Sequence, residues 1–168
     1  MVSEFQDTVE KLYKSENYKD FQKKYKEYYI VHGFVQLNKD FSEKSNWQIG
    51  FYSKQKDNLA IFDSNPFKLI DFEEAFKEDG TIAELKKFET FLKTQQILDL
   101  LKTHLSTKYM SQIPTSFLII VQIIDKLPVY NVTTITEAFS MINTRFDAKT
   151  GKIILDEIRS ILDLRNGN

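Results

Sequence analysis

The 168-residue chain contains no cysteine. This absence excludes disulfide bonds, catalytic thiolates and cysteine-ligated zinc or iron–sulfur sites. Glycine and proline are scarce, with five and three residues, and no glycine stands in a Gly-x-Gly or Gly-Lys-Ser/Thr setting, so no phosphate-binding loop is expected. Because 23 basic residues balance 24 acidic ones, the formal net charge is −1, which gives no general attraction to nucleic acid or acidic membranes.

Long apolar segments are missing too. The longest apolar run is Phe117 to Val121, extended past Gln122 to Ile124, which is far short of the ~20 residues that a membrane helix needs. The first 30 residues have neither the apolar region nor the cleavage site of a secretory signal. We therefore expect a cytoplasmic protein with no membrane partner. A content of 42% hydrophobic and 28% charged residues indicates a folded chain.

The first half changes from a helical to a strand-like period. Ser3 and Gln6 have the spacing of a capping box, and a polar break at 15–17 divides two apolar helical stripes. Three strands are expected after these helices. Pro66 is expected to end the third of them, and 71–78 is predicted as a short helix. The strands themselves are predicted at 30–38, 47–53 and 58–63.

The second half repeats this order of elements. A helical pattern covers 81–109, with Thr81 and Thr94 as alternative starts. An antiparallel return at 153–154 and a closing helix from Leu155 are expected at the end. Between them, strands are predicted at 117–124, 129–136 and 139–147.

The last hairpin has recognisable turn chemistry. Asp147, Thr150 and Gly151 suit a type I turn that ends in a left-handed residue, which glycine tolerates because it has no Cβ. We therefore predict a positive φ at Gly151.

The repeated order indicates an α+β protein of two similar units, 1–80 and 81–168, each a helix on a three- or four-stranded antiparallel sheet. A shift of 84 residues aligns identical residues in the two halves, which favours an internal duplication. Whether the units share one sheet, or pack as one globular domain, is left open by the sequence. The aligned identities are Asp63/Asp147, Lys68/Lys152, Ile70/Ile154 and Glu73/Glu157. The predicted core includes Leu12, Phe21, Tyr25, Phe34, Trp47, Ile49, Phe51, Leu98, Leu101, Leu118, Ile120, Val132 and Ile135.

The C-terminal half resembles a PepSY module over about residues 90–160. The similarity rests on the helix and strand before Pro128-Val-Tyr-Asn-Val-Thr-Thr-Ile, and on Asp147-Ala-Lys-Thr-Gly-Lys-Ile in the final hairpin. In the family the corresponding strand reads roughly Val-Asp-Ala-x-Thr-Gly-Glu-Ile. The resemblance implies a PepSY/cystatin-like fold, in tandem if the first half is a copy. It also implies a non-catalytic module that binds or restrains a protein partner.

The sequence predicts no catalytic, cofactor-binding or metal-binding residue. The two histidines, His32 and His104, lack the spacing of a metal motif, so backbone-bonded histidines are the simpler interpretation. Ser53 and Lys56 match a Ser-x-x-Lys pattern, but they fall in a polar turn where the lysine stays solvated.

Aromatic and basic residues interleave between Tyr18 and Tyr29. They form either a stacking platform for single-stranded nucleic acid or, as we favour, an amphipathic helix whose aromatic residues are buried and whose lysines face solvent. Trp47 either stacks on a ligand or, more often for a strand aromatic, anchors the sheet against its helix. The candidate binding surface is made of Lys23, Lys24, Tyr29 and Trp47.

Three functions are consistent with these features. The leading hypothesis is a non-enzymatic protein-binding, regulatory or inhibitory module, whose sheet pairs by an exposed edge with a protein partner or with itself as a homodimer. The first alternative is a small-ligand-binding protein or enzyme with its site in a cleft between the units, favoured if His32 or His104 lies in a pocket beside a buried carboxylate. The second alternative is nucleic-acid binding through the Tyr/Lys-rich helix.

Overall fold

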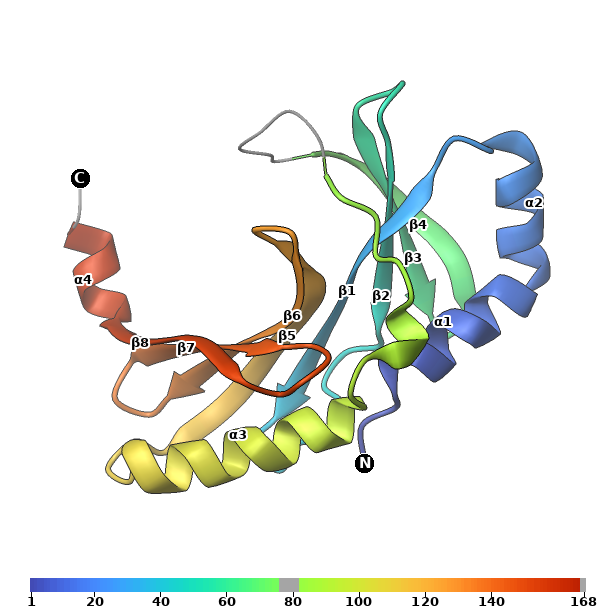
Figure 1. The fold of residues 1–168 in the computed structure, drawn as a ribbon. Helices are drawn as coiled ribbons and strands as arrows, with labels where there is room; N and C mark the ends of the chain where they lie inside the picture. The colour runs from blue at the N-terminus through green and yellow to red at the C-terminus, as the bar shows by residue number, and fades with distance from the viewer. Residues whose placement is uncertain (76–81, 167–168) are drawn as a thin grey trace.

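A computed structural model of the chain describes residues 1–75 and 82–166. Two helices precede four strands, and a third long helix precedes four more strands and a short terminal helix (Figure 1). The helices are α1 (Phe5–Lys14), α2 (Glu16–Lys24), α3 (Thr94–Lys108), α4 (Ile161–Asn166) and the 3₁₀ turn η1 (Phe88–Thr90). The strands are β1 (Tyr29–Asn38), β2 (Gln48–Ser53), β3 (Asn58–Ser64), β4 (Phe67–Glu74), β5 (Pro114–Ile124), β6 (Leu127–Thr136), β7 (Ser140–Asp147) and β8 (Ile153–Ser160).

All the described strands belong to one antiparallel sheet, in the order β4-β3-β2-β1-β5-β6-β7-β8. Each half of the chain is therefore a four-stranded meander, and the two meanders meet where β1 pairs with β5. That pairing runs from His32 opposite Gln122 to Asn38 opposite Ser116. The two halves thus share a single sheet.

The three long helices lie along one side of this sheet, with α1 and α2 beside the β1–β4 half and α3 beside the β5–β8 half (Figure 1). Hydrogen bonds tie the N-terminus to the start of α3: the Phe5 N–H donates to Thr94 Oγ1 (3.3 Å), and the Gln6 side chain donates to the Phe91 carbonyl (2.9 Å). Buried residues of both halves, such as Leu12 and Leu98, belong to one continuous hydrophobic cluster. One core therefore serves both meanders.

The region after Pro66 differs from the sequence prediction. Residues Phe67–Glu74 form strand β4 instead of starting a helix at 71, and 76–78 of the predicted helix lie outside the described residues. The reason is tertiary: β4 pairs along β3, and the ring of Phe72 packs edge-on against Tyr25 of the helix layer at 5.7 Å between centroids. Packing against these neighbours overrides the weak local helical signal.

The starts of two helices also differ in part from the sequence prediction. Helix α3 begins at Thr94, the second of the two predicted starts, while Thr81 lies outside the described residues. The predicted capping box at Ser3 and Gln6 is wrong, because the N-cap residue of α1 is Glu4 and the Ser3 hydroxyl bonds Glu43 instead.

The end of the chain differs as well. Strand β8 extends to Ser160 where a helix was expected from Leu155, because it pairs with β7 along its full length.

Candidate functional site

Strand β5 lies at the centre of the sheet, and within the described residues helices cover only one of its sides. Phe117, Ile119 and Val121 are buried in the core beneath the helices. The alternate residues Leu118 and Ile120 point to the opposite side and remain partly exposed. A central strand that is apolar on both faces is therefore left with one face uncovered by α1, α2 or α3.

An apolar stripe with polar neighbours crosses this second side of the sheet. Phe34 stands opposite Ile120, and Gln36 stands opposite Leu118. Thr133 of β6 is the next residue in the row of Leu118. All of these side chains are partly exposed. We define the open face as Phe34, Gln36, Gln48, Leu118, Ile120, Asn131, Thr133, Ile135 and Asn143, which are neighbours in the register of β2, β1, β5, β6 and β7.

The open face corrects part of the predicted core. Phe34, Leu118, Ile120 and Ile135 were expected to be buried, but they lie on this face and are partly exposed. The prediction was wrong because hydrophobicity in a strand does not say whether something in the same chain covers that face. Tyr25 is partly buried against the core, and the remaining predicted core residues are buried: Leu12, Phe21, Trp47, Ile49, Phe51, Leu98, Leu101 and Val132.

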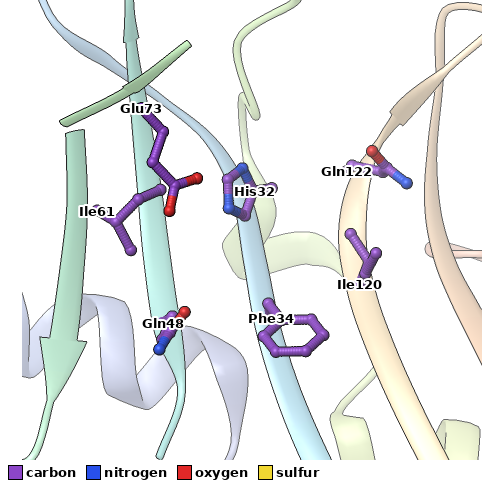
Figure 2. A pocket seen from close by; sticks show the side chains of 7 residues that line it. All are labelled: His32, Phe34, Gln48, Ile61, Glu73, Ile120 and Gln122. Atoms are coloured by element: carbon purple, nitrogen blue, oxygen red, sulfur yellow. The ribbon is translucent and has the colours of Figure 1, made fainter. Parts of the chain in front are cut away.

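A hollow of about 280 Å³ indents the sheet where the two meanders meet (Figure 2). Its apolar walls are Phe34, Ile61 and Ile120, which come from β1, β3 and β5. Its polar lining is His32, Gln48, Glu73 and Gln122. Both halves of the chain thus contribute side chains to one site.

His32 sits in this hollow because Gly50 leaves room for it. The two residues are directly paired across β1 and β2, and a Cβ placed on Gly50 would lie only 2.1 Å from Cε1 of the imidazole. Burial of the ring lowers the pKa of His32 from 6.5 to about 4, because the charged form loses hydration. At neutral pH the ring is therefore uncharged, with one nitrogen that donates and one that accepts hydrogen bonds.

Glu73 supplies the charge of the hollow. Its carboxylate is turned toward the His32 ring (Figure 2), and among the described residues it has no cation within ion-pair distance. Asp71, which is paired with Ile61 in the register of β3 and β4, adds a second carboxylate to the same side. This end of the open face is therefore acidic.

A second titratable cluster joins α3 to β8, on the helix side of the sheet. His104 Nε2 lies 3.1 Å from Asp156 Oδ2, and Lys108 forms an ion pair with the same carboxylate. Burial alone would raise the pKa of Asp156, but bonds from Lys108 and His104 outweigh it and lower that pKa. Thr144 Oγ1 donates to the other oxygen of this carboxylate (3.5 Å), so side chains of α3, β7 and β8 meet at Asp156.

The residues predicted as a binding surface do not come together. Trp47 is fully buried against Phe5, at 5.5 Å between ring centroids, and its Nε1 donates to the Ser3 carbonyl. It is therefore a core anchor and not a surface residue. Lys23 and Lys24 are exposed at the end of α2. Tyr29 is partly buried and donates its hydroxyl hydrogen to the Ile82 carbonyl (2.6 Å).

The aromatic residues Tyr18 and Phe21 of α2 are buried, as expected for an amphipathic helix. Tyr18 and Phe21 are buried in the core and contact Phe51, at 5.3 and 6.2 Å between centroids. Their faces are thus occupied by other rings. A nucleic-acid stacking platform would need such faces to be free.

The predicted positive φ at Gly151 is confirmed. The Asp147 carboxylate accepts the N–H groups of Lys149 (2.8 Å) and Thr150 (3.0 Å), and Gly151 has φ +75°. This positive φ is the left-handed conformation that glycine tolerates.

The described residues contain no group of three or more His, Asp or Glu side chains placed to bind a metal ion. Likewise, no helix in that part of the chain is both long and apolar enough to cross a membrane. The sequence analysis named His32 only as one of two histidines in an alternative cleft site, and it missed Glu73 and Gln122, because only the sheet register brings β4, β1 and β5 to one place.

Comparison with known proteins provides the fold and nothing beyond it. No protein-family model matches the chain, and no curated protein matches it. A crystal structure of a "putative lipoprotein" from Clostridium difficile 630 is similar, with a TM-score of 0.53 and 12% sequence identity. The similarity covers 84% of this chain and 90% of that one. The α+β architecture with an antiparallel sheet is therefore one that a solved structure shares.

Proposed function

We propose that the chain is a non-enzymatic protein-binding module whose open face is covered by a partner polypeptide. The observation that carries this proposal is that β5 is apolar on both sides, while helices of the described part of the chain bury only one of them. The solvated face of an antiparallel sheet is ordinarily polar. Phe34, Leu118, Ile120 and Ile135 instead place an apolar stripe there, which indicates an interaction site.

The composition of the open face fits a protein interface. Its centre carries aromatic and aliphatic side chains beside neutral amides and hydroxyls, such as Gln36 and Thr133, and Arg145, opposite Asn131, adds one charged side chain on β7. Interface centres are similarly depleted of charge and surrounded by groups that can form hydrogen bonds. The PepSY resemblance supports the same proposal, because it too implies a module that binds a protein partner.

An internal duplication is part of the proposal. Adding 84 to the bounds of β1 gives 113–122, close to 114–124 for β5, and adding 84 to β3 gives 142–148, close to 140–147 for β7. The aligned residues Asp63 and Asp147 also have similar roles, since each carboxylate accepts backbone N–H groups from two of the three residues that follow it. These correspondences support two copies of one unit, joined through β1 and β5.

Site-specific crosslinking tests the binding proposal. A photoreactive phenylalanine analogue at Leu118 should form a covalent adduct with a partner protein in cells, whereas the same analogue at Lys102, exposed on α3, should not. The double variant Leu118→Asp/Ile120→Asp should abolish capture of that partner, because it places charges in the buried centre of the interface.

The control for capture is Leu100→Asp, which changes an exposed leucine on α3. It should leave capture unchanged. Equal adducts from Leu118 and Lys102, or full capture by the double variant with a normal thermal unfolding curve, would overturn the proposal.

A further inference from the structure

We propose that the hollow beside the open face receives a basic side chain, arginine or lysine, of the bound polypeptide. This inference rests on the proposed function and names the group that the site recognises.

The first argument is charge. Glu73 is the one acidic side chain among the residues that line the hollow, and it lacks a cationic partner in the described part of the chain. Because His32 is uncharged at neutral pH, it does not neutralise the carboxylate. Asp71 increases the negative potential at the same end. A cation that enters the hollow would therefore form a charge-assisted hydrogen bond with Glu73.

The second argument is shape. Lysine and arginine carry an aliphatic stem that packs along apolar surface and a charged head that needs hydrogen-bond acceptors. In the hollow the stem would lie against Phe34, Ile61 and Ile120, and the head would reach Glu73 (Figure 2). The amides of Gln48 and Gln122 offer additional acceptors without adding charge.

The third argument is position. Phe34, Gln48 and Ile120 belong both to the open face and to the lining of the hollow. A polypeptide that covers the apolar stripe would therefore have residues directly above the hollow. The uncharged stripe supplies contact area, and the hollow would supply specificity for a basic residue at one position of the partner.

Titration with single amino-acid amides tests the inference on the intact chain. The probes are N-acetylarginine amide, N-acetyllysine amide and N-acetylcitrulline amide, the last a neutral analogue of arginine. Two-dimensional NMR should show saturable shifts of the Gln48 and Gln122 side-chain amides and the His32 ring with a basic probe. Citrulline should produce none.

The matched pair of variants is Glu73→Gln and Glu74→Gln. Residue 74 is the next residue of β4, so its side chain leaves the strand on the other side of the sheet. Glu73→Gln should abolish the saturable shifts, and Glu74→Gln should retain them. Absent shifts with both basic probes, equal shifts with citrulline, or shifts that survive Glu73→Gln would each overturn the inference.

The crosslinked partner separates this inference from the function on which it rests. Glu73→Gln should weaken capture of the partner by roughly tenfold or more, the usual loss for a hydrogen bond to a charged group. If Glu73→Gln captures normally while Leu118→Asp/Ile120→Asp does not, the basic side chain is wrong and the protein-binding function stands. If neither variant affects capture, the proposed function fails as well.

Discussion

His32 shows how one residue pair shapes the hollow. Gly50 opposite His32 has no side chain, so the imidazole can lie over the neighbouring strand, with its nearest atom only 2.1 Å from where a Cβ would be. The same packing removes water from the ring, which lowers its pKa. Glycine on one strand thus determines both the shape of the hollow and the charge state of the histidine on the next.

The depressed pKa of His32 predicts a pH dependence of stability. In the folded chain His32 stays neutral down to about pH 4, while in the unfolded chain it is protonated below about 6.5. The unfolded state therefore binds more protons between these values, and stability falls as the pH decreases from 6.5 to 4. His32 should account for a loss of about 3 kcal/mol across this window, since each pKa unit corresponds to 1.36 kcal/mol.

Urea unfolding of the wild type and His32→Gln at several pH values measures this contribution. Because glutamine does not titrate, the variant should lose less stability between pH 6.5 and pH 4 than the wild type. Parallel curves for the two proteins would show that His32 is not desolvated as described.

At the scale of elements, the sequence located strands where local patterns and turn chemistry agree. The strands β1, β2, β3, β6 and β7 were predicted to within a few residues, because alternation and polar turns both indicate them. Strand β4 was missed because it is stabilised by contacts with β3 and α2. These contacts leave no pattern in the local sequence of Phe67–Glu74. The positive φ at Gly151 was predicted because the signal of the turn after Asp147 is entirely local.

The turn between β7 and β8 provides an element-scale prediction. Gly151→Val should destabilise the protein by roughly 1–3 kcal/mol, the cost of holding a β-branched residue at positive φ. A Cβ there would also approach Leu100 and Leu92 at 2.7 and 2.9 Å, but these are ends of flexible side chains that can move. The backbone conformation should therefore dominate the loss.

Gly151→Asn is the matched control, because asparagine tolerates the left-handed region. It should lose clearly less stability than Gly151→Val in thermal or urea unfolding. An equal loss in both variants would mean that contact with the leucines, and not backbone strain, determines the cost.

At the scale of the whole molecule, the sequence indicated two repeated halves but could not show how they join. The joining pairs, from His32–Gln122 to Asn38–Ser116, are long-range contacts that leave no local pattern. For the same reason the open face and its hollow were not predictable, although the apolar residues of β5 were evident. A strand that is apolar on both faces is expected to be covered on both faces. In β5 the helices cover one face, and we propose that a partner covers the other.

The shared sheet and shared core predict that the two halves unfold as one cooperative unit. Trp47 is fully buried and reports on the first half through its fluorescence, while far-UV circular dichroism reports on the entire sheet. The two urea transitions should coincide. The variant Leu98→Ala, in the buried face of α3, should lower the stability reported by Trp47 by about 2–5 kcal/mol, although it removes contacts from the other half of the chain.

The control is Leu100→Ala, which truncates an exposed leucine two residues away on the same helix. It should change stability by about 0.5 kcal/mol or less. Because buried residues of both meanders belong to one cluster, neither half can keep its apolar surface covered after the other has unfolded. A Trp47 transition that stays in place in Leu98→Ala, while the circular dichroism transition splits in two, would show that the meanders are independent folding units joined only by the β1–β5 pairing.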